Sequence, residues 1–216
     1  MHKKMKQVRD LFFVMMGLLA LSFTLTSCDD DDDNGKDTDY YRTLTAAEKA
    51  AVLDAVVGTY TGQFYTVNYS CQYVLDSIEG SVTMGKDTTF VINNLPTSLL
   101  SAYLSVDGES SLLEEAPSVN IGGTYYALDE VYAPYYEAGI YQYMMTPQDQ
   151  VTLTAGTNTV TLYFSTYIMN AYSGGFYTMC SLNNSKKLTV CLDIAGIKVG
   201  ESLYSVNRPI YFIGDK

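Results

Sequence analysis

The spacing of apolar residues changes at Gly58 from a helical pattern to an alternation with a period of two. The segment Gly58–Tyr69 has the alternation of a strand with one buried face. Comparable segments follow along the rest of the chain: Cys71–Ile78, Ser81–Met84, Thr88–Ile92, Val151–Leu153, Val160–Phe164, Tyr163–Tyr172, Phe176–Leu182, Leu188–Ile194 and Arg208–Ile213. This count predicts an all-β domain of eight to ten antiparallel strands, either a closed barrel or a β-sandwich.

The amino-acid composition agrees with this fold class. The chain has 20 tyrosines and no tryptophan, and aromatic and β-branched side chains suit the half-buried surface of a strand. Turn residues separate the segments at Gly85-Lys86-Asp87, Ala155–Asn158 and Asn183–Ser185. Residues 44–216 are therefore expected to form a single β-rich domain.

Short helices are expected at two places beside the strands. Thr45 and Glu48 have the spacing of a capping box, which predicts a helix that ends at Gly58. In the region 96–116, Leu99, Leu100 and Tyr103 recur at helical spacing and favour a small helical excursion between strands.

The N-terminus has the organisation of a secretory signal peptide. Basic residues precede an apolar run from Leu11 to Leu25, and small residues stand before Cys28. This run of about 15 residues is shorter than the roughly 20 that cross a bilayer as a helix. Residues 1–27 are therefore predicted to be a signal peptide rather than a membrane span.

Residues 28–43 are expected to be an acidic tether. The ending Leu25-Thr26-Ser27-Cys28 resembles a bacterial lipobox, which implies that Cys28 becomes the lipidated N-terminus after cleavage. Acyl chains contribute about 0.8 kcal/mol per buried methylene and would anchor the chain to a membrane. The five carboxylates of Asp29–Asp33 cannot be desolvated together, so this run stays hydrated.

The charge balance argues against nucleic acid as a partner. Without residues 1–27 the chain has nine basic against twenty-three acidic residues, and residues 40–216 alone have eight against sixteen. Binding a phosphate backbone requires lysine and arginine to displace counterions. The sequence has no basic stripe that could do so.

The residues for several kinds of catalysis are missing. The single histidine, His2, lies in the predicted signal peptide, so nucleophile activation by histidine and histidine-ligated zinc sites are excluded. A glycosidase needs two facing carboxylates, and the candidates are Glu114-Glu115, Asp129-Glu130, Asp76, Glu137 and Asp193. Adjacent carboxylates point in different directions, which leaves a pair assembled from distant strands, such as Asp76, Glu137 or Asp193, as the remaining option. We expect no enzyme activity. No cofactor and no metal site is expected either.

Tyrosines cluster in one part of the sequence. The candidate binding residues are Tyr125, Tyr126, Tyr132, Tyr135, Tyr136, Tyr141 and Tyr143. Tyrosine combines an apolar face with a polar tip, which suits recognition surfaces, although ordinary packing in a tyrosine-rich sheet explains such a cluster too. The hypothesis is a binding module for a small ligand or glycan. The alternative is an assembly component that contacts another envelope protein through an exposed strand.

The chain resembles a family of uncharacterised Bacteroidetes lipoproteins classed as a domain of unknown function. The resemblance rests on the lipobox and tether, on Leu44–Tyr65 and more loosely on Asn94–Leu100; Gly58–Gly62 also resembles the first strand of calycin-like, lipocalin-type barrels. The tether resembles the surface-export signal of these lipoproteins, which implies an outer-membrane, cell-surface location. In enterobacterial lipoproteins, by contrast, an aspartate after the cysteine is associated with inner-membrane retention.

The sequence also bears on two covalent modifications, O-glycosylation and disulfide formation. Asp76-Ser77-Ile78 and Asp87-Thr88-Thr89 resemble the O-glycosylation acceptor of exported Bacteroidetes proteins, which implies Ser77 and Thr88 as acceptors. Export would permit disulfides among Cys71, Cys180 and Cys191. A two-residue turn at Asn184-Ser185 would place Cys180 and Cys191 diagonally on one face, a separation often too long for a bridge. We expect three reduced thiols.

Overall fold

The computed structural model describes residues 40–68, 73–104, 107–165, 167–170 and 174–216. Its strands are β1 (Tyr41–Thr43), β2 (Gly58–Val67), β3 (Val74–Met84), β4 (Thr89–Leu95), β5 (Val119–Ala127), β6 (Glu130–Tyr132), β7 (Tyr141–Pro147), β8 (Gln150–Ala155), β9 (Asn158–Ser165), β10 (Tyr167–Asn170), β11 (Gly174–Tyr177), β12 (Met179–Leu182), β13 (Lys187–Val199) and β14 (Ser202–Asp215). Its helices are α2 (Ala46–Val56), the 3-10 helix η2 (Thr97–Tyr103), α3 (Asp107–Glu115) and α4 (Ala133–Glu137).

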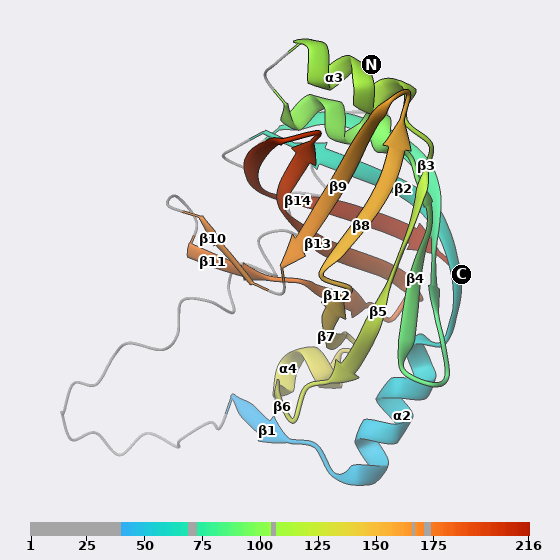
Figure 1. The fold of residues 1–216 in the computed structure, drawn as a ribbon. Coiled ribbons are helices and arrows are strands. Elements are labelled where there is room, and N and C mark those ends of the chain that lie inside the picture. The colour runs from blue at the N-terminus through green and yellow to red at the C-terminus, as the bar shows by residue number, and fades with distance from the viewer. Residues whose placement is uncertain (1–39, 69–72, 105–106, 166, 171–173) are drawn as a thin grey trace, which may run out of the picture.

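Ten of these strands form one antiparallel sheet that closes on itself. The order is β12-β7-β5-β4-β3-β2-β14-β13-β9-β8, and an additional pairing of β12 with β13 completes a ring. Eight strands belong to this ring, and each is hydrogen-bonded on both sides, which removes the exposed edges of an open sheet. The expectation of an all-β barrel or sandwich is confirmed (Figure 1).

One wall of the barrel is made from an interrupted strand. β9 pairs with β13 up to Ser165↔Asp193, and β12 continues along the same strand from Met179↔Cys191. Between them the chain forms the separate β10–β11 hairpin. The Thr178 hydroxyl holds the junction: it donates to the Ser165 carbonyl at 2.6 Å and accepts from the Asp193 backbone N–H at 3.1 Å.

Helices lie at both ends of the barrel. In Figure 1, α3 lies at one end and α2, with β1, β6 and α4, at the other. Thr45 and Glu48 form the predicted capping box at the start of α2. At its other end, the Tyr60 hydroxyl donates to the Val56 carbonyl at 2.8 Å, one of the last carbonyls of the helix, which lack helical partners.

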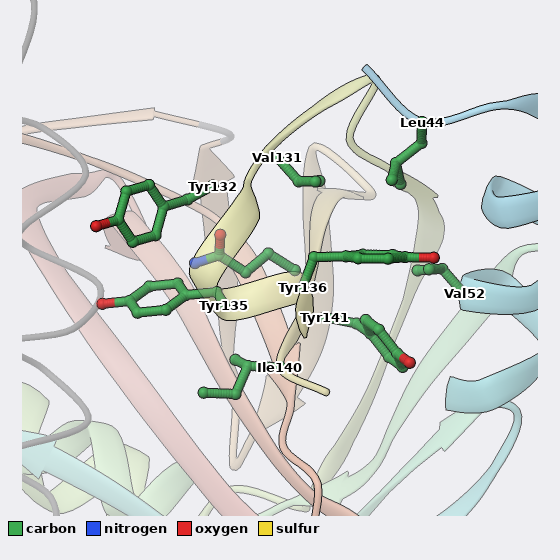
Figure 2. Close-up of a pocket in the computed structure, with 9 residues that line it drawn as sticks. Leu44, Val52, Val131, Tyr132, Tyr135, Tyr136, Ile140 and Tyr141 are labelled. Atoms are coloured by element: carbon green, nitrogen blue, oxygen red, sulfur yellow. The ribbon is translucent and has the colours of Figure 1, made fainter. Parts of the chain in front are cut away.

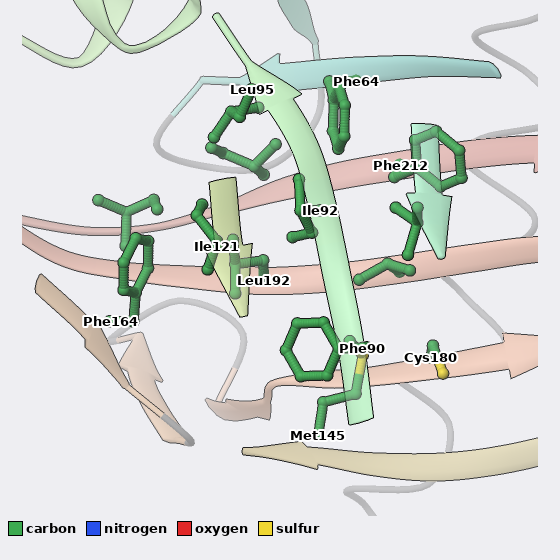
Figure 3. Packing of buried hydrophobic residues seen from close by; sticks show 14 of the residues in the cluster. Phe64, Phe90, Ile92, Leu95, Ile121, Met145, Phe164, Cys180, Leu192 and Phe212 are labelled. Atoms are coloured by element: carbon green, nitrogen blue, oxygen red, sulfur yellow. The ribbon is translucent and has the colours of Figure 1, made fainter. Parts of the chain in front are cut away.

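The barrel interior is filled by aromatic and aliphatic side chains (Figure 3). The rings of Phe64 and Phe212 are 4.9 Å apart, and both lie where glycines leave room. A Cβ added to Gly80 would be 2.2 Å from the Phe64 ring, and one added to Gly214 would be 2.4 Å from the Phe212 ring. Glycine at these positions allows the Phe64 ring to pack directly on the backbone of the neighbouring strand β3 and the Phe212 ring to pack on the backbone of its own strand β14.

The turn between β12 and β13 differs from the expected one. It spans Asn183 to Lys186, with Leu182 paired to Leu188, rather than two residues at Asn184-Ser185. Cys180 is therefore paired with Val190 in the sheet. This shift by one residue turns side chains to the opposite face, so Cys180 points into the core cluster while Cys191 belongs to a separate outer cluster.

Candidate functional site

The seven candidate tyrosines separate into three groups. Tyr125 and Tyr143 are 2% and 0% exposed and lie in the barrel interior, with their rings 6.0 Å apart. Their hydroxyls donate to the carbonyls of Gly85 at 2.7 Å and Val52 at 2.8 Å. Burial raises the pKa of Tyr125 to about 12 and also raises that of Tyr143. These two residues stabilise the fold and lie apart from the other five.

Tyr126 is the one candidate tyrosine that lies on the outer wall of the barrel within the described chain. It alternates with Tyr125 along β5, faces outward and is 53% exposed. Its neighbour in the sheet is Met144 of β7, and no ring contact joins it to the tyrosines near α4 within the described chain. It therefore provides an exposed tyrosine outside the cluster.

The remaining candidates gather around α4 with two tyrosines that the sequence reasoning did not include. β1 pairs with β6, which brings Tyr41 opposite Tyr132. The Tyr132 ring contacts Tyr40 at 6.1 Å, Tyr41 at 5.7 Å and Tyr135 at 5.0 Å between centroids. We call these four residues, Tyr40, Tyr41, Tyr132 and Tyr135, the tyrosine surface. Tyr40 and Tyr41 are exposed and the other two are half-buried.

The short helix α4 divides the tyrosines of this end between two sides. Figure 2 shows Tyr132 and Tyr135 pointing to one side, and Tyr136 and Tyr141 pointing the other way, toward Val52 of α2. Tyr136 and Tyr141 pack against each other at 5.7 Å and against the core cluster. Pro134 in the first turn and Gly139, with a φ of +72°, start and end this helix.

Arg42 connects the tyrosines to α2. Its guanidinium lies 4.8 Å from the centre of the Tyr136 ring, a cation–π contact, and forms an ion pair with Glu48. Hydrogen bonds from the Thr45 backbone and from Arg42 lower the pKa of Glu48 to about 2. The positive charge of Arg42 is thus already matched by a carboxylate.

A shallow hollow lies beside α4. It is lined by Leu44, Val52, Val131, Tyr132, Tyr135, Tyr136, Ile140, Tyr141 and Gln142, and measures about 260 Å³ including open solvent. Its enclosed part holds no more than about one water molecule. This shape suits contact with an extended surface of a ligand rather than engulfment of a whole molecule.

Gln142 is the polar residue of this hollow and was not considered from the sequence. It is 7% exposed, and its side-chain amide forms no hydrogen bond with any described residue. The strand alternation of β7 places it on the face opposite to Tyr143. A glutamine within a tyrosine-rich segment gives no sequence signal of its own, because its burial depends on the position of α4.

The candidate carboxylates are scattered. Glu114, Glu115, Asp129, Glu130, Asp76 and Glu137 are all exposed. Asp193 is 1% exposed, and neither of its carboxylate oxygens has a hydrogen-bond partner among the described residues. Burial raises the pKa of Asp193 to about 7. Within the described residues, no three histidine, cysteine or acidic side chains are grouped as a metal site would require.

The candidate modification sites have different surroundings. Cys28 lies outside the described residues, as does Cys71. Ser77 is exposed on β3, and Thr88 is half-buried in the β3–β4 turn. Cys180 and Cys191 are buried on opposite faces of the sheet and are not bridged to each other, and their reduced state stays a prediction. None of the helices in the described part of the chain has the length and apolar character needed to cross a membrane.

Comparison with known sequences gives one match. The model of the DUF4840 family, described as a domain of unknown function, matches residues 55–199. That range includes α4 and Gln142 but begins after Tyr40 and Tyr41. No curated protein and no solved structure matches this chain.

Proposed function

This chain belongs to the DUF4840 family, a domain of unknown function, and we propose that it is a non-enzymatic binding module anchored on a bacterial cell surface. In this proposal, lipid on Cys28 attaches the protein to the outer membrane. The tyrosine surface then recognises a small ligand or glycan.

The observation that carries the proposal is the assembly of the tyrosine surface from two distant parts of the chain. Tyr40 and Tyr41 meet Tyr132 and Tyr135 through the β1–β6 ladder. The hydroxyls of Tyr40, Tyr132 and Tyr135 form no hydrogen bond with described residues. Grouped aromatic rings with free polar tips offer both stacking area and hydrogen bonds to a ligand.

The anchor would keep this surface near the membrane. Tyr40 follows Cys28 by twelve positions, and an extended chain spans at most roughly 3.3–3.6 Å per residue, or about 40 Å here. A ligand in the outer cell envelope would thus lie within reach of the tyrosine surface.

The binding proposal is tested with the mature lipoprotein on a glycan array and in a small-ligand screen. The double variant Tyr132→Ala, Tyr135→Ala should lose binding by about tenfold or more, since two contacting rings are removed. The matched control is Tyr126→Ala, which removes an exposed tyrosine from the barrel wall and should bind as the wild type does. Equal loss in both variants, or in neither, contradicts the proposal.

The anchor is tested separately. Cys28→Ala should release the protein from the membrane fraction and remove the acyl mass, whereas unchanged fractionation would contradict lipidation. Deleting Asp29–Asp33 should reduce protease access on intact cells if the run directs surface export.

For O-glycosylation, peptide mapping of native protein should find a glycan on Ser77 or Thr88. Unmodified peptides at both positions would exclude it.

A second candidate function rests on β8. Within the described chain this strand pairs only with β9, so its other edge could accept a strand from another envelope protein. Lysine at the exposed positions Thr152 and Thr154 should then abolish co-purification of that partner, because charge on an edge strand opposes pairing. Co-purification that survives both substitutions excludes this edge.

A further inference from the structure

The Gln142 amide lacks a partner in a place where an amide normally has one. Gln142 is 7% exposed, lies in the hollow beside α4 and forms no hydrogen bond with the described protein. The amide atoms of Gln142 are not among the fully buried side-chain atoms that lack a partner in the described chain, so they keep some contact with solvent. An amide in this position is satisfied by water or by a ligand.

The surroundings of Gln142 restrict the chemistry of that partner. Tyr132 and Tyr135 line the same hollow, and their rings present flat apolar faces with polar edges. The glutamine amide supplies a donor and an acceptor side by side. A ligand that matches both the tyrosine rings and the amide has an apolar C–H face and a neighbouring pair of hydroxyls that can donate and accept hydrogen bonds.

The net charge of the domain further restricts the class of ligand. Residues 40–216 carry sixteen acidic side chains against eight basic ones. Arg42, which contacts the Tyr136 ring beside the hollow, is paired with Glu48. The overall negative charge disfavours an anionic ligand. The surface is consequently better suited to a neutral molecule than to an anionic one.

We propose that the tyrosine surface binds a neutral saccharide, with one sugar ring against Tyr132 or Tyr135 and two of its hydroxyls hydrogen-bonded to the Gln142 side-chain amide. This inference rests on the proposed binding function and names its ligand class. The enclosed part of the hollow has room for about one water molecule, which matches a sugar that lies on the surface with its ring outside the hollow.

The test uses the mature lipoprotein in a zwitterionic detergent that has no sugar headgroup. Calorimetric titration is carried out with neutral oligosaccharides of gluco, galacto and manno configuration, and with oligosaccharides that contain uronic acid. At least one neutral saccharide should bind, and the uronic-acid forms should bind about tenfold more weakly or not at all. Binding of uronic-acid forms alone, or of none of the sugars, overturns the inference.

Two substitutions that keep the side chain nearly the same size test the role of the Gln142 amide. Gln142→Met removes both hydrogen-bonding groups and Gln142→Glu removes the donor, and each should weaken saccharide binding by about tenfold, as expected for a lost hydrogen bond. Because the amide forms no hydrogen bond with the described residues, Gln142→Met should leave the Tm of the sugar-free protein unchanged. A clearly lowered Tm would assign Gln142 a structural role with bound water only, and would overturn the inference.

The variants also separate this inference from the proposed function. If Tyr132→Ala, Tyr135→Ala loses binding while both Gln142 variants bind normally, the tyrosine surface is the binding site and the role of Gln142 is refuted. If neither set of variants affects binding, both proposals fail. Loss of binding in both sets, with Tyr126→Ala unaffected, supports both.

Discussion

The tyrosines inside the barrel and those around α4 show opposite uses of the same side chain. Tyr60, Tyr125 and Tyr143 are buried, and each hydroxyl donates to a backbone carbonyl. Tyr132 and Tyr135 keep their rings partly exposed and have hydroxyls without a described partner. A buried hydroxyl must be hydrogen-bonded within the protein because its desolvation is costly, whereas a partly exposed hydroxyl can bond to water or to a ligand.

The comparison shows that tyrosine richness alone does not identify a recognition surface. Two of the seven candidate residues proved to be core residues that tie strands to α2 and to the β3–β4 turn. Tyr40 and Tyr41, outside the candidate segment, joined the cluster instead. The hydrogen bonding of the hydroxyl distinguishes the two uses better than the density of tyrosines in the sequence does.

The largest expected effect comes from removing a core tyrosine. Tyr143→Ala should reduce the free energy of unfolding by about 3–5 kcal/mol, because it leaves a cavity in the barrel and removes the hydrogen bond to Val52. Urea denaturation measures this value. A loss below about 1 kcal/mol would mean that the interior ring is not part of the packed core.

Asp193 offers a contrast, since it is buried without the pairing that the core tyrosines have. Its pKa is raised from 3.8 to about 7, so the folded state binds a proton more tightly than the unfolded state does. The wild type should therefore lose this contribution as the pH rises from about 4 through 7. Asp193→Asn cannot ionise and should be more stable than the wild type at pH 8, by on the order of 4 kcal/mol at most.

Urea denaturation of both proteins at pH 4 and pH 8 checks this effect. The difference between variant and wild type should be largest at pH 8 and should vanish or reverse at pH 4. Comparing the two proteins at each pH removes the contributions of the other carboxylates. Equal stability of the wild type and Asp193→Asn at pH 8 would show that a hydrogen-bond or ion-pair partner stabilises the Asp193 carboxylate.

Alkaline titration sharpens the comparison among the core tyrosines. Burial raises the pKa of Tyr60 and Tyr125 from 10.0 to about 12, so their neutral forms are favoured in the folded state. Stability from this source is complete below pH 10 and is lost as the pH rises through 12. Ultraviolet absorbance of tyrosinate should show these residues ionising near pH 12 together with unfolding. Ionisation at pH 10 in a folded protein would contradict their burial.

The smallest effect on stability is expected at the tyrosine surface. Tyr135→Phe removes a hydroxyl that has no described partner and should change the free energy of unfolding by less than about 0.5 kcal/mol. Tyr143→Phe removes a paired hydroxyl and should cost about 1 kcal/mol. Parallel urea denaturation of the two variants decides whether hydroxyl pairing separates the groups, and a reversed order would refute that distinction.

Short-range features of this protein followed from the sequence itself. The capping box of Thr45 and Glu48 formed as expected, and the β8–β9 hairpin turns at Gly156, whose φ of +60° suits glycine. The helical excursion appears as η2 and α3 within the region 96–116. Each of these features depends on residues only a few positions apart, so the local sequence contains the necessary information.

The tertiary structure alone decided which distant segments meet. The pairing of β2 with β14, of β7 with β12 and of β1 with β6 has no local signal. A difference of one residue in the β12–β13 register placed Cys180 and Cys191 on opposite faces of the sheet. Side chains alternate between faces along a strand, so the facing of every residue depends on a register that the whole barrel sets. The position of Gln142 under α4 has the same origin, because only the folded chain brings that helix over β7.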